Sequence, residues 1–255
     1  MPPFASYPSL SGRTVFVSGG GSGIGASIVE HFAAQGACVG FVDIDEASST
    51  ALVESIRAAG HPAPLFVPCD IRDVGAYQSA IEGVAAKLGT ITVLVNNAAR
   101  DDRHTIDQVT PDFWDERIAV NLRHAYFAIQ TVAPGMKKAG GGSVVNFSSV
   151  SYHTMTPKLS VYQAAKAAVI GMTRGLARDL GGDGIRLNAV TPGWIMTQRQ
   201  LDLWVTPEAK AAQLSAQCLK ELLYPPDIAR MVLWLASDDS RLVTAQDFVV
   251  DGGRV

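Results

Sequence analysis

Three side chains near the middle of the chain are of types that can move a proton. Tyr162 and Lys166 stand four residues apart in a segment whose pattern predicts a helix, so both side chains project from one face. A fixed ammonium beside a phenol favours the phenolate, and lowering the pKa of tyrosine from ~10 to ~7 takes roughly 4 kcal/mol. The phenolate would be a general base for an alcohol proton, and the phenol a general acid for a carbonyl oxygen. Ser149 adds a hydroxyl nearby in sequence. A Tyr-x-x-x-Lys spacing also arises by chance, so its meaning depends on the rest of the chain.

A glycine-rich stretch follows the first apolar run of the chain. Residues 13–18 predict a strand, and an apolar 3.6-residue period from Ile24 to Ala33, stopped by Gly36, predicts a helix. Between them, backbone N–H groups and the helix dipole can approach a pyrophosphate. The residues expected to hold it are Gly19, Gly21, Ser22, Gly23, Ile24 and Gly25. The alternative is a glycine turn without a ligand.

Asp43 ends the second predicted strand, 18 residues beyond Gly25. An acid at about this distance accompanies the dinucleotide fingerprint and accepts hydrogen bonds from the adenosine ribose. The same carboxylate repels a 2′-phosphate, at up to ~4 kcal/mol for a like-charge pair ~4 Å apart. We therefore expect NAD rather than NADP as cofactor. The alternative is that Asp43 is an exposed turn acid.

Strands and helices alternate along the whole chain. Valine- and isoleucine-rich strands that alternate with helices predict an α/β protein with a doubly wound parallel sheet, covered on both faces, in one domain over residues 1–255. A short polar arm (1–12) precedes it, and a less regular region runs from Pro192-Gly193 to about residue 224. The expected strands are 13–18, 37–42, 63–68, 91–95, 143–147, 185–190 and 246–250, and the expected helices are 24–35, 46–59, 73–88, 111–138, 159–180 and 227–236.

The composition excludes several classes of protein. A formal net charge of −3 gives no reason to expect a nucleic acid or an anionic membrane as partner. The start of the chain shows no secretory signal, and the longest apolar runs are far below the ~18 residues of a membrane span, so we expect a cytoplasmic location. The three cysteines show no C-x-x-C pair, and no His, Cys or Asp cluster has metal-ligand spacing. We expect no catalytic metal.

In order and spacing, these motifs resemble the short-chain dehydrogenase/reductase family over nearly the whole chain. Within that family the sequence is most similar to bacterial NAD-dependent aldose 1-dehydrogenases of the D-xylose dehydrogenase kind. The stretches that suggest this are 101–104, 113–118, 120–124, 134–138 and 216–220. The residues that carry the family resemblance are Ser18-Gly19, Gly23-Ile24-Gly25, Cys69-Asp70-Ile71, Asn96-Asn97-Ala98-Ala99, Asn121, Ser149, Tyr162, Lys166 and Pro192-Gly193. The chain departs from the usual family pattern at Ser18, Ala99, Gln163-Ala164-Ala165 and Thr244-Ala245. None of these departures removes a catalytic group.

The resemblance implies roles for the motif residues. Tyr162 would be the general base for sugar oxidation, with Lys166 lowering its pKa and holding the nicotinamide ribose. Ser149 would bind the reacting oxygen, and Asn121 would support a water relay from Lys166 to solvent. Further cofactor contacts would come from Asp70, Ile71, Asn97, Ala98, Ala99, Pro192, Gly193, Ile195 and Thr197.

The substrate end of the site is predicted to be polar. Asp101, Asp102, His153 and Trp194 would join Ser149 and Tyr162 around a polyhydroxylated substrate, because such a ligand needs several donors, acceptors and one aromatic face. Each polar residue is alternatively a solvated loop residue. His104 is a loop hydrogen-bonder or a ligand, and Trp194 is a sugar platform or a lid anchor.

Two other functions and one assembly remain open. The same family includes reductases of ketones or 3-oxoacyl substrates, and a dinucleotide-binding regulator without turnover needs only the glycine loop and Asp43. The family also implies a homotetramer built through two long helices. The residues considered for that contact are Ala125, Tyr126, Ile129, Val132, Ala167, Val169, Ile170 and Met172, which could equally face the core.

Overall fold

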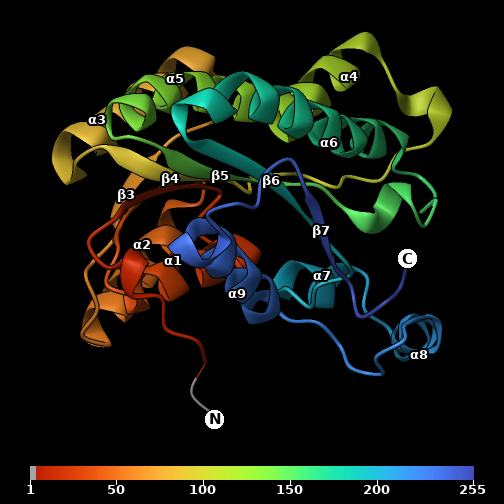
Figure 1. Ribbon diagram of the computed structural model, residues 1–255. Coiled ribbons are helices and arrows are strands. Elements are labelled where there is room, and N and C mark those ends of the chain that lie inside the picture. The colour runs from red at the N-terminus through yellow and green to blue at the C-terminus, as the bar shows by residue number, and fades with distance from the viewer. Residues whose placement is uncertain (1–3) are drawn as a thin grey trace.

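Seven parallel strands form one sheet in the computed structural model, which describes residues 4–255 (Figure 1). The strand order is β3-β2-β1-β4-β5-β6-β7, so the α/β prediction of a doubly wound parallel sheet is confirmed. The assignment of residues 1–255 to one catalytic domain stays a prediction. The strands are β1 (Thr14–Ser18), β2 (Cys38–Asp43), β3 (Leu65–Pro68), β4 (Ile91–Asn96), β5 (Gly142–Phe147), β6 (Ile185–Pro192) and β7 (Asp247–Val250).

Helices cover both faces of the sheet (Figure 1). α1, α2 and α9 lie on one face, and α3, α5 and α6 lie on the other. The α-helices are α1 (Gly23–Ala34), α2 (Glu46–Ala58), α3 (Val74–Leu88), α4 (Pro111–Ile118), α5 (His124–Lys138), α6 (Ser160–Leu180), α7 (Gln198–Leu203), α8 (Pro207–Ala216) and α9 (Pro225–Ala236). Short 3₁₀ turns lie at η1 (Pro8–Leu10), η2 (Ile106–Gln108), η4 (Val150–Tyr152), η5 (Gly181–Asp183) and η6 (Asp238–Ser240), and a π-helical turn at η3 (Ala119–Arg123).

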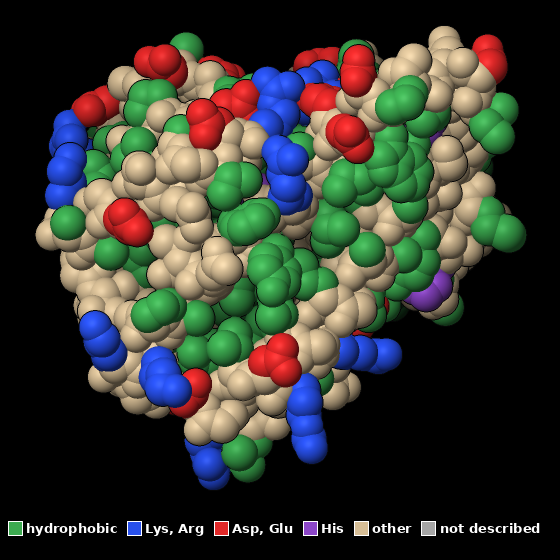
Figure 2. All heavy atoms as spheres, turned by 90° about the horizontal axis from the view of Figure 1, so that it is seen from above, with side chains coloured by type: hydrophobic (Ala, Val, Ile, Leu, Met, Phe, Trp, Pro, Cys, Tyr) green, Lys and Arg blue, Asp and Glu red, His purple; other side chains and the backbone are tan. Residues whose placement is uncertain are grey.

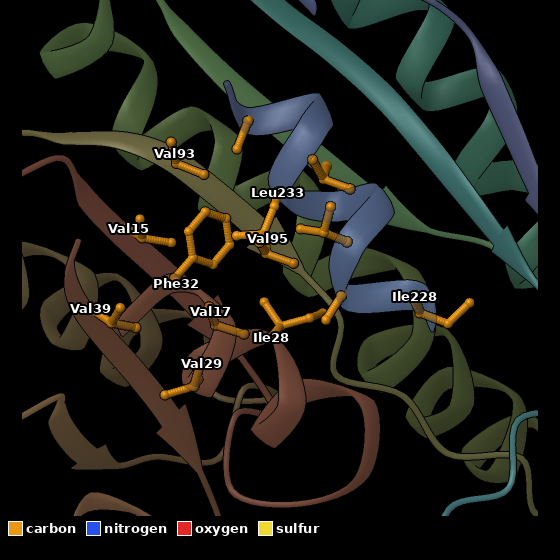
Figure 3. Packing of buried hydrophobic residues seen from close by; sticks show 14 of the residues in the cluster. Val15, Val17, Ile28, Val29, Phe32, Val39, Val93, Val95, Ile228 and Leu233 are labelled. Atoms are coloured by element: carbon orange, nitrogen blue, oxygen red, sulfur yellow. The ribbon is translucent and has the colours of Figure 1, made fainter. Parts of the chain in front are cut away.

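The central strands carry mostly apolar residues because helices bury them on both sides. Every residue of β1 is buried. Val15 and Val17 pack toward α1 and α9 (Figure 3). Phe16 belongs to the second cluster, which includes residues of α3 and α5. Burying side chains of this kind contributes ~1.5–3 kcal/mol each. Two apolar clusters, one on each face, therefore hold the sheet rigid beneath the site.

The sheet reverses its strand order between β1 and β4. β1 pairs with β2 on one side and with β4 on the other, so the connections after these strands leave in opposite directions. A crevice forms at the carboxyl ends of such strands, and ligands of open α/β sheets bind there. Ser18 and Asn96 end the two strands at this point.

The helix predicted over residues 111–138 is interrupted. The π-helical turn η3 separates α4 from α5, and Asn121 lies inside it. The Asn121 amide nitrogen donates to the carbonyl oxygens of Arg117 (3.0 Å) and Arg100 (3.1 Å). A side chain that enters the backbone hydrogen-bond pattern in this way locally widens a helix.

Two further sequence predictions are corrected, one for the less regular region after Pro192-Gly193 and one for the N-terminal arm. The less regular region contains α7 and α8, which start at capping threonines Thr197 and Thr206. Neither helix buries a residue, so no apolar period marks it. Within the predicted arm, residues 1–3 lie outside the described residues, and Leu10 is buried in the core beside α1 and α9 rather than in a polar arm. Among residues 4–255, no helix combines the length and apolarity that a membrane crossing requires.

Candidate active site

The glycine loop turns tightly from β1 into α1. The N–H groups of Gly19 and Gly20 donate to the carbonyl oxygen of Val42 at 2.8 and 3.1 Å. Gly19 has a φ of +66°, and a Cβ atom at Gly25 would lie 1.8 Å from the carbonyl oxygen of Gly19. Only glycine fits at these positions, and the bare backbone at the start of α1 forms a cradle for a phosphate group.

Ser18 connects this loop to the end of β4. Its hydroxyl oxygen accepts hydrogen bonds from the backbone N–H groups of Asn97 (3.1 Å) and Ala98 (3.2 Å). The Asn97 amide nitrogen donates back to the carbonyl oxygens of Ser18 (3.1 Å) and Gly19 (2.9 Å). The departure from threonine to serine at position 18 therefore keeps the group that the structure uses.

Asp43 lies beside the loop at the end of β2. One carboxylate oxygen accepts from the N–H of Gly21 (2.8 Å) and the other from the N–H of Asp45 (3.0 Å). An ionised carboxylate has about four acceptor sites, so two bonds leave capacity for the hydroxyls of a ribose. The cradle and this carboxylate together fit a nicotinamide dinucleotide.

A cavity of about 800 Å³ runs along the carboxyl ends of the strands. It has room for a dinucleotide and a small substrate together. Gly21 is the one predicted cofactor residue that does not line it, since its N–H holds Asp43 instead. The predicted cofactor residues that do line it are Gly19, Ser22, Gly23, Ile24, Gly25, Asp43, Asp70, Ile71, Asn97, Ala98, Ala99, Tyr162, Lys166, Pro192, Gly193, Ile195 and Thr197.

Helix α6 brings Tyr162 and Lys166 into this cavity. The Lys166 ammonium lies 5.7 Å from the centroid of the Tyr162 ring and donates to the carbonyl oxygen of Phe147 at 2.9 Å. Ser149 follows β5 and also lines the cavity. Its hydroxyl oxygen accepts from the N–H of Ser151 (3.2 Å), so the hydroxyl hydrogen is available to the phenol oxygen of Tyr162 or to a substrate.

The pKa shifts correct one prediction from the sequence. Burial, followed by the charge of Asp101, raises the pKa of Tyr162 above its ordinary value, while the Ser149 hydroxyl and the charge of Arg103 oppose that rise. Burial also lowers the pKa of Lys166 to about 7. The protein groups alone therefore do not give Tyr162 the lowered pKa that the Tyr-Lys spacing predicted, because removal from water disfavours both charged forms.

Asn121 is buried and does not line the cavity. Its side-chain oxygen accepts from the N–H of Arg100 (2.9 Å), and its nitrogen is engaged by the carbonyls of Arg117 and Arg100. These bonds fasten the segment after β4 to the π-helical turn. The water relay that the family resemblance implies would have to involve the backbone of Asn121, because its side-chain amide is already hydrogen-bonded to backbone groups.

Asp101 and Trp194 both line the cavity, and their role toward a substrate stays a prediction. Both are tied to α7. The Gln200 side-chain amide nitrogen donates to Asp101 (3.1 Å), and the Trp194 indole N–H donates to the side-chain oxygen Oε1 of Gln200 (2.8 Å). Arg199 adds an ion pair with Asp101 at 3.4 Å. These contacts anchor α7 over the site.

Asp102 and His153 are corrected, since neither lines the cavity. The Asp102 carboxylate is surrounded by guanidinium groups and forms ion pairs with Arg100 (2.9 Å), Arg117 and Arg199 (3.3 Å). His153 packs against the ring of Tyr152, with 4.0 Å between ring centroids. Asp102 is thus a structural acid in an arginine cluster, and His153 belongs to the loop outside the wall.

The structure adds wall residues that the sequence did not single out. Arg103, Gln200 and Arg254 line the cavity. Arg103 could have been noticed in the run Asp101-Asp102-Arg103-His104, whereas nothing in the sequence marks Gln200 or Arg254. Gln200 lines the cavity because α7 passes beside it, and Arg254 lines it because the chain after β7 returns to the same place.

Arg103 is the most conspicuous of these additions. Its guanidinium carbon lies 5.0 Å from the Trp204 ring, and one nitrogen donates to the carbonyl oxygen of Pro157 at 3.3 Å. Its Nε atom is buried without a hydrogen-bond partner among residues 4–255. By contrast, Arg199 is ion-paired, so Arg103 is a cation held in the wall with donor capacity to spare.

Comparison with known proteins agrees with the site. A family model described as "Enoyl-(Acyl carrier protein) reductase" matches residues 19–254. "Probable galactose dehydrogenase GalD" of Rhizobium meliloti is 50% identical over 251 residues, spanning 98% of each protein. "D-xylose 1-dehydrogenase" of Caulobacter vibrioides is 50% identical over 249 residues, again spanning 98% of each. A crystal structure of a 3-oxoacyl-[acyl-carrier protein] reductase with bound NAD from Brucella melitensis has a TM-score of 0.89 at 31% identity and covers 100% of this chain and 98% of that chain.

These matches extend over nearly the whole chain. Tyr162, Lys166, Ser149 and the glycine loop line one cavity of the structure. The site combines a glycine loop at a helix start, an acid at the end of β2 and a tyrosine beside a lysine. The chain belongs to the short-chain dehydrogenase/reductase family of oxidoreductases.

Proposed function

We propose that this protein oxidises an aldose at C1 to the aldonolactone, with NAD as cofactor. The observation that carries the proposal is the outer wall of the cavity. There, Asp101, Arg103 and Gln200 present hydrogen-bonding groups beside Tyr162 and Ser149. A polyhydroxylated ring needs such groups, and two proteins 50% identical to this chain bear the names of sugar dehydrogenases.

Ser149 and Tyr162 act on the C1 oxygen of the sugar. The Ser149 hydroxyl hydrogen donates to that oxygen and orients it toward Tyr162. The Tyr162 phenolate takes the hydroxyl proton as the C1–H bond breaks. NAD, when bound in the cavity, would supply the hydride acceptor, and its oxidised nicotinamide would add a positive charge that favours the phenolate.

Lys166 is a positioning residue and does not itself take the proton from the sugar. Its ammonium, anchored on the Phe147 carbonyl oxygen, is close enough to the Tyr162 ring to favour the phenolate when it is protonated. It also offers hydrogen bonds to the nicotinamide ribose. Asn121 completes this arrangement by fixing the segment after β4, and its backbone carbonyl supports the water relay.

Asp43 selects the cofactor. Its carboxylate, held by Gly21 and Asp45, accepts the hydroxyls of the adenosine ribose and repels a 2′-phosphate. A like-charge pair at ~4 Å costs up to ~4 kcal/mol before screening, so we expect NAD to be preferred at least about tenfold.

A second candidate is reduction of a 3-oxoacyl substrate. The description of the matching family model and the Brucella melitensis reductase favour it. An acyl chain requires an apolar wall, whereas the substrate end here is charged and tied to α7 by Asp101. Turnover of an acyl thioester with NADPH, and none with sugars, would establish this alternative.

We also propose that the protein assembles as a homotetramer through α5 and α6. The structure separates the residues considered for the contact: Ala125, Ile129, Val132 and Val169 are buried within one subunit, whereas Tyr126, Ala167, Ile170 and Met172 are at least partly exposed. A groove between these helices, lined by Leu122, Tyr126, Ala168, Met172 and Leu176, supports the proposal. Figure 2 shows hydrophobic side chains gathered on this face.

The test is NADH formation by the purified protein with D-xylose, L-arabinose, D-galactose and L-fucose. NADP⁺ and simple alcohols are the controls, and the product is analysed for lactone. We expect turnover of at least one aldose, with NAD⁺ preferred. Tyr162→Phe should lose about 10²–10⁴-fold in kcat, the range that general acid–base catalysis contributes. Activity on no aldose, or a Tyr162→Phe variant within tenfold of the parent, would refute the mechanism.

A further inference from the structure

The helix that carries the catalytic pair lacks a cap of its own. α6 begins at Ser160 after Leu159, whose apolar side chain makes no capping hydrogen bond. The first N–H groups of a helix have no partner within the helix and need one from elsewhere. Tyr162 lies in this first turn, so a loose helix end would move the phenol directly.

His104 supplies the missing partner from the segment after β4. Its Nε2 atom accepts from the backbone N–H of Val161 at 3.3 Å and lies 3.1 Å from the Ser160 hydroxyl oxygen. Its Nδ1 atom lies 3.1 Å from the carbonyl oxygen of Asp102. The imidazole is 5% exposed, and its centroid is 5.1 Å from that of the Phe113 ring.

These partners require one tautomer of the imidazole. A backbone N–H can only donate, so Nε2 must be the acceptor and cannot carry a hydrogen. A carbonyl oxygen can only accept, so Nδ1 must carry the hydrogen. With Nε2 accepting from Val161 and Nδ1 donating to Asp102, the neutral Nδ1–H form satisfies every partner around the ring.

The backbone of His104 strengthens the connection. Its N–H donates to the carbonyl oxygen of Lys158 at 2.9 Å. Lys158 has a φ of +62°, in the left-handed region that non-glycine residues rarely adopt. His104 thus holds the last turn of the loop before α6 as well as the helix end itself.

We propose that His104 is a positioning residue that caps α6 from outside and holds Tyr162 at the reacting oxygen. The proposal rests on the proposed role of Tyr162 as the general base. The same segment carries Asp101 and Arg103 in the cavity wall, so one histidine fixes the substrate wall and the catalytic helix relative to each other. The effect belongs to kcat, because His104 does not line the cavity.

Two substitutions separate capping from mere filling of space. His104→Gln places an amide oxygen near the position of Nε2, where it can accept from Val161. The amide of His104→Asn reaches only as far as Nδ1, so it can donate to Asp102 but cannot cap the helix. We expect His104→Asn to lose about tenfold in kcat with KM for sugar and for NAD within about twofold, since a lost cap shifts a helix-end equilibrium by about this factor. His104→Gln should keep kcat within about threefold.

Equal losses in the two variants, or an unchanged kcat in His104→Asn, would overturn the proposal. His61→Asn, at an exposed histidine in the loop after α2, is the matched control and should leave kcat unchanged. Melting temperatures show whether each variant is folded.

The unmodified protein provides a test that depends on neither variant folding nor on sugar turnover. ¹⁵N NMR of the histidine rings should show His104 as the Nδ1–H tautomer, and amide exchange should show protection of Val161. An Nε2–H tautomer, or an unprotected Val161 amide, would overturn the capping role. If no aldose is oxidised, the proposed function fails while these two measurements still decide whether His104 caps α6.

Discussion

Arg103 is the residue whose surroundings most clearly call for a ligand. Its Nε atom is buried without a partner among residues 4–255, while the ring of Trp204 and the carbonyl oxygen of Pro157 hold the guanidinium in place. A guanidinium has five N–H donors, and the bond to Pro157 uses one of them, so the terminal nitrogens keep donors that a hydroxyl of the substrate can accept. Its positive charge also opposes the rise in the pKa of Tyr162.

We therefore expect Arg103→Met to raise KM for the sugar about tenfold, corresponding to ~1.4 kcal/mol, while KM for NAD changes less than about twofold. The pH profile of kcat/KM should move to higher pH, because loss of a cation raises the pKa of Tyr162. Steady-state kinetics across pH measure both effects. Arg57→Met is the control, since Arg57 is paired with Glu54 on the exposed side of α2. An unchanged KM for sugar would show that Arg103 does not contact the substrate.

Lys166 makes the stability of the protein depend on pH. Its pKa falls from the ordinary 10.5 to about 7 on folding because it is buried. Between pH 7 and 10.5 the unfolded chain therefore binds more protons at this residue than the native chain. Stability rises with pH wherever the unfolded state binds more protons, so the penalty from burying Lys166 is largest below pH 7 and disappears as pH rises toward 10.5.

Lys166→Met removes this dependence. In the protein without cofactor, the free energy of unfolding of the variant relative to the parent should fall as pH rises from 7 to 10, by up to about 1.4 kcal/mol per pH unit. Loss of the bond to Phe147 shifts both ends of the curve equally and leaves the slope unaffected. Denaturant titrations at several pH values give the slope, and parallel curves for the two proteins would contradict the burial of an uncharged lysine.

At the scale of elements, the short loop before β7 stores local strain. Ala245 has a φ of +60°, and its N–H donates to the carbonyl oxygen of Leu187 at 2.7 Å. A side chain in the left-handed region costs ~1–2 kcal/mol, whereas glycine adopts it freely. The family pattern has glycine at this position, and the structure shows why.

Ala245→Gly should stabilise the protein by roughly 0.5–1 kcal/mol, because the relief of strain exceeds the ~0.4–1 kcal/mol that glycine adds in chain entropy. For a chain of this length the melting temperature should rise by about 2–4 °C per kcal/mol. Calorimetry provides the measurement. Gly83→Ala, in the middle of α3 with nothing within 4 Å of a Cβ, is a matched exchange in the opposite direction and should also stabilise. A lower melting temperature for Ala245→Gly would mean that the loop is not strained.

Side chains connect several of the elements around the site. Gln163, a departure between Tyr162 and Lys166, donates to the carbonyl oxygens of Ser151 (2.9 Å) and Thr156 (2.7 Å). It thereby fixes the loop after β5 against α6. Together with the contacts of His104, these bonds explain how a helix without a cap of its own holds a catalytic phenol.

At the scale of the whole molecule, the apolar groove between α5 and α6 is the surface on which the proposed tetramer rests. Tyr126 is 46% exposed there, and the neighbouring wall comes from Leu122 and Met172. An exposed apolar groove of this kind marks a contact with another protein surface. Because α6 also carries Tyr162, assembly would add support to the helix behind the site.

Tyr126→Glu should dissociate the proposed tetramer, because the contact would bury a carboxylate without a partner in an apolar groove. Sedimentation velocity would then report a smaller species than the parent protein. Ile106→Glu, at a residue that is 90% exposed on η2, is the control and should leave the assembly unchanged. A parent protein that sediments as a monomer would refute the tetramer outright.

The order of elements, the glycine loop, the position of Asp43 and the Tyr162–Lys166 face could be predicted from the sequence alone. These features depend on apolar period and on spacing within a few residues, which the chain itself fixes. The π-helical turn could not be predicted, because it depends on Asn121 bonding to Arg100, 21 residues earlier. α7 and α8 left no periodic signal, because neither buries a face.

Only the tertiary structure decided which polar side chains face the substrate and which titration shifts they undergo. Asp101 and Arg199 are 98 residues apart in sequence, yet their pairing ties α7 to the cavity wall. Asp102 and His153 are also polar. The Asp102 carboxylate, however, is ion-paired with neighbouring arginines, and the His153 ring packs against Tyr152. Spacing placed Tyr162 beside Lys166, while burial reversed the expected shift of the tyrosine pKa. Burial and long-range pairing arise only when distant segments pack together, so the sequence alone does not determine them.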